Sequence, residues 1–469
     1  MKWFQWERQA TVLPIIMCMR AWEKPMTNAY GKCWPTTVII YNNDIVGWYN
    51  KWEELLHYGQ YLIETFTKKI DMDEFEQELK KQTEKFDLEF KKLDETNLRM
   101  LSDNEIIETY KRIEQMWTEW FVPGGLVEPV GHQGERILER ITNNDKKAIS
   151  LLTSTNRESF SKRELRGMLE ILIAKKTERD LDDLIENHVK KYYWIHNNYF
   201  TTEVLDRQFF LNELKNIEEK YPEPEEQIKA MDDEIEKTNR EKEKLIETLK
   251  LGEKDKKLIR LLDMFSWYQD YRKEYIMQLL HYLDWIVAEV GARKGISLKE
   301  MKYALPEEII TGRLDREKMQ ERMKRFIYNW NFEHNKSEFG SGLFAVEKEK
   351  QIFHEISHSD DITEVSGMVA NKGIVRGVAR ITMSAKEAGQ IKKGEILITS
   401  MTTPDFVTAM KRAGAIVTNE GGVLCHAAIV SRELNLPCIV GTRIATKIFK
   451  NGDMIEVDGN LGVVRKIDK

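Results

Sequence analysis

The stretch TNEGGVLCHAAIVSREL, residues 418–434, holds the side chain with the clearest chemical potential. Gly421 and Gly422 follow a short β-branched run and allow the backbone to turn sharply before an apolar helix, which is expected to begin at about His426. A helix N-terminus favours an anion and disfavours imidazolium relative to neutral imidazole. Because neutral imidazole is a nucleophile, His426 is suited to attack a phosphoryl group and then carry it.

A histidine that only packs at a helix start is the competing interpretation, because Gly-Gly followed by His is a weak motif by itself. Cys425 is expected to be a small packed residue, since adjacent side chains on a helix do not face one another. Arg432 follows His426 by six residues and falls about 120° around the helix from it. An ion pair is therefore favoured for Arg432 over a role during docking.

The elements that must position His426 differ from those in the rest of the chain. After about Val365, short β-branched runs alternate with Gly and Asp-Gly turns, which predicts a compact α/β domain at 365–469. Residues 1–335 carry apolar residues at spacings of three and four and are predicted to form a large α-helical domain. Within it, the charged segment 222–252 is expected to form a helical arm, as a protruding hairpin. Residues 336–364 are interpreted as a linker and hinge.

Composition narrows the class of protein. The 469 residues include 72 Lys and Arg against 78 Asp and Glu, a net charge of -6, so no binding of nucleic acid or anionic lipid is expected. Four cysteines without metal-like spacing fit reduced thiols. The apolar run 11–19 contains a proline and is too short for a membrane span. A cytoplasmic protein without membrane attachment is expected.

The C-terminal sequence closely resembles the swivelling phosphohistidine domain of phosphoenolpyruvate-utilising enzymes. The resemblance spans about 365–467 and includes VSGMVANKGIVRGVARI, GEILITSMTTPDF and NGDMIEVDGNLGVV in one register with the stretch quoted above. It is closest to the branch of synthase-like and rifampicin-phosphotransferase-like proteins. The resemblance implies that His426 is the phosphorylated residue. It further implies a phosphate loop and helix containing Gly421, Gly422, Cys425 and Ala427, and candidate docking residues Thr402, Glu420 and Arg432.

Residues 264–309 look like the helical region that precedes this domain in the same branch, which implies that the helical part binds a small-molecule acceptor. Neither an ATP-grasp domain nor a TIM barrel is visible, and no GxxxxGK[ST] loop occurs. The chain itself is therefore expected to bind no cofactor, and ATP and Mg²⁺ are expected to act through an ATP-grasp partner. Candidates for the acceptor site are His132, in a glycine-rich loop expected at 121–135, and the side chains Trp120, Tyr268 and Arg272.

Two rival functions remain open. Residues 354–358 read HEISH and satisfy the HExxH pattern of zinc proteases, but no second motif supplies a third ligand, so no metal site is predicted. A non-catalytic binding protein with a degenerate phosphohistidine domain is the second rival. The favoured hypothesis is the transfer component of a phosphotransferase, with the acceptor and the oligomeric state undetermined.

Overall fold

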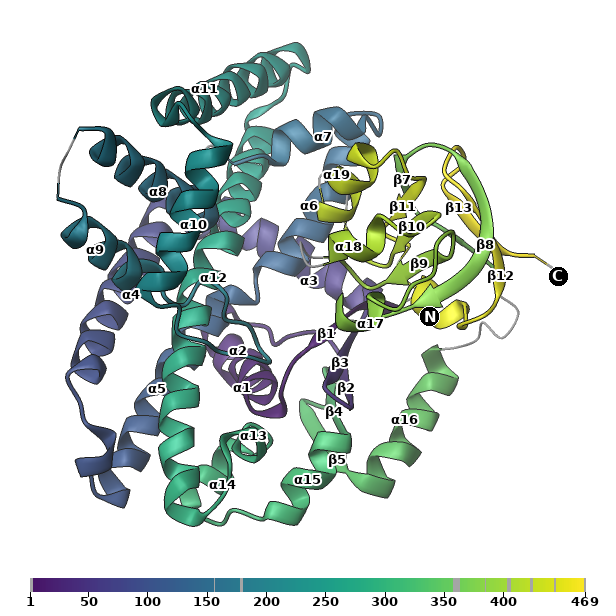
Figure 1. Cartoon of the computed structure of the whole chain (residues 1–469). Coiled ribbons are helices and arrows are strands. Elements are labelled where there is room, and N and C mark those ends of the chain that lie inside the picture. Colours follow the sequence, from purple (N-terminus) through teal and green to yellow (C-terminus); the bar gives the residue numbers. More distant parts are fainter. Residues whose placement is uncertain are drawn as a thin grey trace. The chain divides into compact units, whose positions relative to one another are not determined.

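The computed structural model describes residues 3–155, 157–177, 180–356, 363–383, 385–402, 406–421, 425–442 and 444–467. The chain divides into two compact units. The first, called the mixed unit here, joins Met1–Gln9, Val38–Lys51 and Leu343–Lys469. The second, called the helical unit, consists of Ala10–Thr37 and Trp52–Gly342. Figure 1 labels the elements of both.

The helical unit is built around α12, Glu253–Lys294, a helix of 42 residues. It ends at Gly295, whose φ of 67° is the left-handed conformation that glycine adopts without steric cost. Its apolar face packs against α5, Asp103–Gly124, which begins with a capping box between Ser102 and Glu105. The other helices of the unit are α1 Val12–Trp22, α2 Lys24–Tyr30, α3 Trp52–Lys68, α4 Met72–Asp94, the 3-10 helix η1 Leu98–Met100, α6 Val127–Ile141, α7 Lys146–Thr153, α8 Phe160–Lys176, α9 Asp182–Tyr192, α10 Arg207–Lys220, α11 Pro224–Thr248, α13 Leu298–Met301, α14 Pro306–Thr311 and α15 Arg316–Lys324.

Residues 1–335, predicted as a large α-helical domain, also contain strands, which were not predicted. In the mixed unit, β1, Trp3–Gln9, pairs antiparallel with β3, Ile45–Lys51. β2, Thr37–Asn42, leads into a tight turn at Asn43 and Asp44, both with positive φ. In the helical unit, β4 and β5 form an antiparallel pair, Arg325–Asn331 with Lys336–Ser341. Strands β1 to β4 are short and rich in aromatic or β-branched residues, which suits strands.

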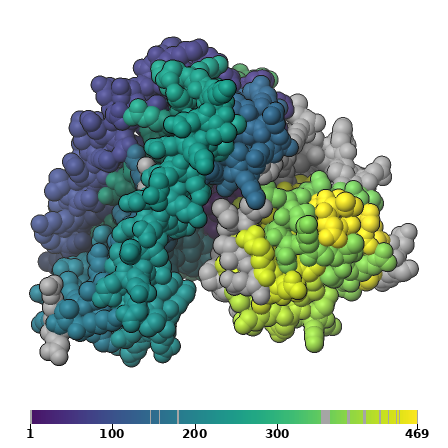
Figure 2. All heavy atoms as spheres, turned by 90° about the horizontal axis from the view of Figure 1, so that it is seen from above, coloured from purple at the N-terminus to yellow at the C-terminus, as the bar shows by residue number. Residues whose placement is uncertain are grey.

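The rest of the mixed unit contains the predicted α/β domain, whose eight strands have the order β6-β13-β12-β8-β9-β10-β11-β7. The central strands β8 to β11 run parallel in sequence order, and the outer strands pair antiparallel. In Figure 2 its yellow and yellow-green atoms form one compact body. The strands are β6 Glu364–Ser366, β7 Met368–Asn371, β8 Ile374–Ile381, β9 Ile396–Thr399, β10 Ala415–Thr418, β11 Cys438–Val440, β12 Met454–Asp458 and β13 Val463–Lys466, and the helices are α17 Ala385–Ala388, α18 Val407–Met410, α19 His426–Glu433 and α20 Ala445–Ile448.

Strands β9, β10 and β11 are buried on both faces, with successive side chains entering different apolar clusters. Leu397 and Ile416 pack with residues of α18 and α19, whereas Ile396, Ile398 and Val417 pack with residues of α20, β12 and β13. The ends of β9 and β10 are therefore fixed from both sides. Those ends carry the loops of the candidate site described below.

The glycine-rich segment 121–135 is helical, so the prediction of a loop there was wrong. It contains the last turn of α5 and the first turns of α6. Two glycines allow helices to pack closely: a Cβ on Gly59 of α3 would lie 2.1 Å from the carbonyl oxygen of Pro129, and one on Gly134 would lie 2.4 Å from Leu262. Gly134 therefore marks a close helix contact, while Gly125 lies in the short turn between α5 and α6.

The other two segments singled out in the sequence also have regular structure. The predicted arm at 222–252 is a single helix, α11, rather than a hairpin, and it packs on α7 and α8 with Met231 buried. Residues 336–364, interpreted as a linker, contain β5 and then α16, Gly342–Ile356, while 357–362 lie outside the described residues. Hinge motion there stays a prediction. Across the described ranges, we find no helix whose length and apolar content would suit a membrane span.

Glu23, between α1 and α2, is a half-buried carboxyl group that receives a hydrogen bond from the Tyr328 hydroxyl. Burial raises the pKa of Glu23 to about 7, and the nearby Arg20 opposes the rise. A carboxyl pKa that is higher in the folded state stabilises the fold below the unfolded pKa and loses that contribution as the pH rises through about 7.

Between about pH 4.5 and pH 7, we therefore expect the unfolding free energy of the wild type to decrease by about 1–2 kcal/mol more than that of Glu23→Gln, once solvent screening is allowed for. The measurement is urea unfolding at several pH values. The matched control Glu243→Gln, on the exposed side of α11, should keep the wild-type slope. The prediction fails if the two variants show the same pH dependence.

Candidate functional site

His426 is the first residue of α19, as the sequence predicted. The preceding Cys425 is in extended conformation and makes no side-chain hydrogen bond to the helix start, so its side chain does not cap the first-turn N–H groups. Ala427, Ala428 and Val430 are buried in the apolar cluster that includes Ile416. This packing fixes the helix while the imidazole of His426 stays half-exposed.

Thr402 orients the imidazole ring. Its Oγ1 lies 2.9 Å from Nδ1 of His426, and Thr402 itself is buried. When Nδ1 carries the hydrogen and donates it to Thr402, Nε2 is left with the lone pair that a nucleophile needs. Thr402 was predicted to take part in docking, and its contact with His426 was not predicted from the sequence. The available signal was topological: residues 402 and 426 follow neighbouring parallel strands, β9 and β10, at their carboxyl ends.

Gly421 has a conformation and surroundings that exclude a side chain. Its φ is 107°, and a Cβ would lie 2.7 Å from Sγ of Cys425. Only glycine at position 421 therefore allows the loop after β10 to lie this close to the start of α19. Gly422 lies outside the described residues. The structure thus gives a physical reason for the first of the two predicted glycines.

Glu420 and Ser400 join the two loops beside the histidine. The N–H of Glu420 donates to the carbonyl oxygen of Ser400 at 2.9 Å, and the Ser400 hydroxyl donates to Oε1 of Glu420 at 2.8 Å. The Thr418 hydroxyl also donates to the Glu420 carbonyl oxygen, at 2.6 Å. Arg432 lies exposed on α19. Glu420 and Arg432 were predicted site residues, whereas Ser400 was not.

The four candidate acceptor residues are linked by contacts in the helical unit, and two of them, Arg272 and His132, approach Glu128, which was not predicted from the sequence. The Arg272 guanidinium donates to the carbonyl oxygen of Gly124 and lies 3.6 Å from Oε1 of Glu128. Nε2 of His132 lies 3.8 Å from the other oxygen of Glu128. Trp120 donates to the carbonyl oxygen of Arg272 at 2.9 Å and meets the Tyr268 ring edge-to-face at 5.6 Å.

Burial separates these four residues into two pairs. Trp120 and Tyr268 are fully buried, and burial raises the pKa of the Tyr268 hydroxyl well above its usual value. His132 is 25% exposed and its ring meets Trp52 edge-to-face at 5.2 Å. Trp120 and Tyr268 therefore act as a packed support, and His132 is the residue through which a ligand could reach Glu128 and Arg272.

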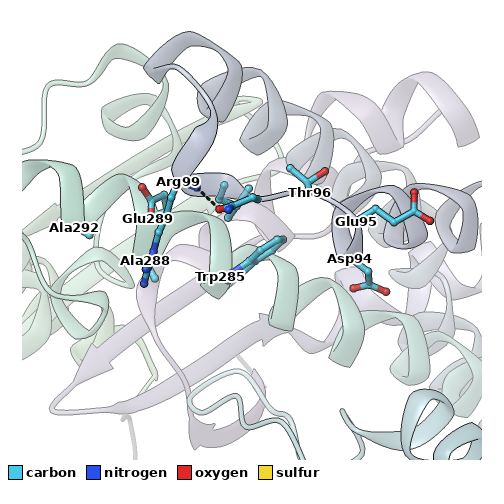
Figure 3. Close-up of a pocket in the computed structure, with 10 residues that line it drawn as sticks. Asp94, Glu95, Thr96, Arg99, Trp285, Ala288, Glu289 and Ala292 are labelled. Atoms are coloured by element: carbon cyan, nitrogen blue, oxygen red, sulfur yellow. Dashed lines mark hydrogen bonds between the residues drawn. The ribbon is translucent and has the colours of Figure 1, made fainter.

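A separate pocket of about 560 Å³ lies on the helical unit where α4, η1 and α12 meet. Figure 3 shows Trp285, Ala288 and Glu289 of α12 on one side and the segment from Asp94 to Arg99 on the other. None of the predicted site residues lines it. The backbone N–H of Arg99 donates to the Asn97 side chain at 3.2 Å, so part of its wall is held by a local turn.

The HExxH segment falls partly outside the described residues. Residues 354–356 belong to α16, and Ser357 and His358 are among those not described. Where the structure describes the chain, no three His, Cys, Asp or Glu side chains come together as a metal site. Because His358 lies outside those residues, a zinc site at 354–358 is not tested.

Comparison with known proteins identifies the domain that carries His426. Residues 391–462 match the family described as PEP-utilising enzyme, mobile domain, which confirms the resemblance of this part of the chain. Over 100 residues the chain is 54% identical to the probable phosphoenolpyruvate synthase of Archaeoglobus fulgidus, covering 21% of this chain and 13% of the synthase. Over 105 residues it is 39% identical to the uncharacterized phosphotransferase YvkC of Bacillus subtilis, covering 22% of this chain and 13% of YvkC.

Both matches cover only a small part of each protein compared. The chain spans about an eighth of the length of either relative. Among solved structures, an NMR structure of Enzyme I is 30% identical over 18% of this chain and 34% of its own, with a TM-score of 0.16, too low for a comparison of folds. The mobile domain is thus identified by sequence similarity.

Proposed function

We propose that this chain is the transfer component of a phosphotransferase, in which His426 receives a phosphoryl group from a donor protein and passes it to a small-molecule acceptor. The observation that carries the proposal is the position of His426, the first residue of a helix, with Nδ1 in contact with Thr402. The similarity of 391–462 to a mobile domain of PEP-utilising enzymes supports the same chemistry.

The proposed reaction has two steps, in which Nε2 of His426 is first the nucleophile and then the leaving group. First, Nε2 of His426 attacks the phosphorus of a donor phosphate, a P–N bond forms, and the donor oxygen leaves with the electron pair of the broken P–O bond. Second, a hydroxyl oxygen of the acceptor attacks the phosphorus. The P–N bond breaks, its electron pair returns to Nε2, and the hydroxyl proton passes to solvent.

The residues around His426 lower the barrier to these steps by orientation and electrostatics. Thr402 holds the ring so that Nε2 carries the lone pair, and the N–H groups of the first turn of α19 stabilise the negative charge of the bound phosphoryl group. Cys425 and Ala427 shape the helix start without taking part in bond formation. ATP and Mg²⁺ belong to the donor, for which we propose an ATP-grasp protein acting in trans.

We further propose that the helical unit binds the acceptor, with His132, Glu128 and Arg272 as the polar groups that contact it. The approach of both His132 and Arg272 to Glu128 within 4 Å supports this assignment. Trp120 and Tyr268 hold them from behind.

The direct test uses the chain, a cognate ATP-grasp protein and labelled ATP. Protein-bound label that is stable in base and lost in acid is the expected result, since phosphohistidine has this stability. Omission of the ATP-grasp protein is the control and should leave the chain unlabelled. Complete absence of label with a donor that phosphorylates another mobile domain would favour the degenerate binding protein instead.

A companion prediction is that the chain alone does not bind ATP at low micromolar concentration, because no nucleotide-binding motif was recognised in its sequence. Isothermal titration calorimetry with ATP and Mg²⁺ should show no saturable heat. Tight binding would mean that the helical unit includes a nucleotide site.

Removing the hydroxyl of Thr402 should slow phosphorylation of His426. We expect Thr402→Val to reduce the rate about tenfold to a hundredfold, because the imidazole loses the contact that sets its tautomer and orientation. Thr402→Ser keeps the hydroxyl and should restore most of the rate. Equal rates for the valine and serine variants, measured by quench-flow labelling, would show that the contact has no such role.

A further inference from the structure

Among the described residues, the main chain of Glu7 in the N-terminal strand contacts the loops beside His426. Within the mixed unit, the N–H of Glu7 in β1 donates to Oε1 of Glu420 at 3.3 Å. The Ser400 hydroxyl lies 3.0 Å from the carbonyl oxygen of Glu7 and 2.8 Å from Oε1 of Glu420, so its one hydrogen is shared between these two acceptors. Ser400 and Glu420 thus contact both the N–H and the C=O of Glu7.

The strand register explains why Glu7 offers both groups on one side. β1 lies at the edge of its sheet and pairs antiparallel with β3, with Glu7 opposite Gly47. In an antiparallel pair, alternate residues direct their N–H and C=O toward the partner strand or away from it. Because Glu7 is bonded to Ser400 and Glu420, its two groups point away from β3, whereas those of Trp6 and Arg8 point toward β3.

Ser400 and Glu420 therefore bind the free edge of β1 in the way that an additional strand would, but through two side chains. Such recognition depends on the extended main chain and not on the identity of residue 7. The Glu7 side chain lies in a separate contact, where its Oε1 accepts a hydrogen bond of 3.3 Å from the Tyr49 hydroxyl. The side chains of Ser400 and Glu420 are thus placed to bind the main chain of an edge strand.

Ser400 and Glu420 lie on the two loops that also position His426. Ser400 is two residues from Thr402, which contacts His426, and Glu420 immediately precedes Gly421, which lies against Cys425. The 2.9 Å hydrogen bond between the backbones of Glu420 and Ser400 joins the loops. A phosphoryl group on His426 brings negative charge to the loops that hold the Glu420 carboxylate, and like charges repel.

We propose that Ser400 and Glu420 form a latch that holds the edge of β1 at Glu7 while His426 is unphosphorylated and releases it once His426 carries a phosphoryl group. The first half stands on the hydrogen bonds of Glu7, and the second half rests on the proposed function. Release would free the domain that carries His426 at the step when its phosphoryl group must move to the acceptor.

The test of the first half is hydrogen–deuterium exchange resolved to single amides by fragmentation mass spectrometry. In Ser400→Ala and Glu420→Ala, the Glu7 amide should exchange about tenfold faster than in the wild type, while the Arg8 amide keeps the protection that β3 gives it. Thr446→Ala, which removes a hydroxyl bonded to Asn419 of the same loop region, is the matched control. Unchanged exchange at Glu7, or equal acceleration at Arg8, would overturn the latch.

The second half is tested with the chain phosphorylated chemically by phosphoramidate, which needs no donor protein. Glu7 exchange should accelerate several-fold in the phosphorylated wild type and not in identically treated His426→Ala. Equal Glu7 rates with and without phosphate on His426 would overturn the coupling. If neither phosphoramidate nor a donor modifies His426, the proposed function and the coupling both fail, while the Ser400 and Glu420 variants still decide the latch.

Discussion

His426→Ala should abolish phosphorylation of the chain, reducing the label obtained with an ATP-grasp donor and labelled ATP to background. No other histidine that the structure describes begins a helix in contact with a threonine as His426 does, so substitution of another histidine should not have this effect. Because alanine keeps the helix start, the domain should remain folded. The expected loss is at least a thousandfold, as is usual when the nucleophile of a covalent step is removed.

The matched control is His132→Ala, which removes the histidine proposed to contact the acceptor. It should accept label at the wild-type rate and lose only the second step. Circular dichroism of both variants checks folding. Label that survives in His426→Ala would show that another residue carries the phosphoryl group, and loss of label in His132→Ala would show that the two steps are not separable.

Gly421→Ala should reduce phosphorylation of His426 at least a hundredfold while the chain remains folded. The new Cβ would lie 2.7 Å from Sγ and 3.0 Å from Cβ of Cys425, and the φ of 107° is unfavourable for any L side chain. The loop must therefore move away from the start of α19. A displacement of about 1 Å at a reacting group can cost a hundredfold in rate.

Gly452→Ala provides the control for backbone strain alone. Gly452 has a φ of 93°, and a Cβ there would meet nothing within 4 Å. We expect Gly452→Ala to lower the unfolding free energy by about 1–2 kcal/mol with little effect on phosphorylation. If both variants label at the wild-type rate, the close approach of Gly421 has no functional importance.

The position of His426 could be predicted because its determinants are local. Two glycines after a β-branched run and an apolar segment beginning at the histidine specify a strand, a turn and a helix within about fifteen residues. Thr402 and Ser400 could not be connected to it in the same way. They approach the histidine only because β9 and β10 are neighbours in the sheet, and strand order is a long-range property that composition does not reveal.

Glycine was the least reliable indicator in the helical part. At 121–135 it was interpreted as a loop, but Gly134 lies in α6 against Leu262, where a side chain would not fit. The sequence does not distinguish a glycine that turns the chain from one that lets two helices approach. The candidates Trp120, Tyr268, Arg272 and His132 did lie together, because α5, α6 and α12 pack on one another, while Glu128 between them gave no periodic signal.

The strands of the N-terminal region were missed for a different reason. β1 and β3 are each seven residues long and contain tryptophan or tyrosine beside charged residues, a composition that also occurs on helices. Their pairing is stabilised by stacking of Trp6 on Trp48, with ring centroids 5.0 Å apart, and this contact exists only once the two segments meet.

The mixed unit combines residues near the two ends of the chain, and this has a consequence for biosynthesis. Lys51 and Leu343 belong to the same unit but are separated by the whole of Trp52–Gly342. At about 5–20 residues per second, a ribosome needs roughly 15–60 s to pass from the first to the second. During that interval the nascent β1–β3 strand pair exists without the domain that the edge of β1 will meet, so we expect it to bind a chaperone that shields exposed strand edges.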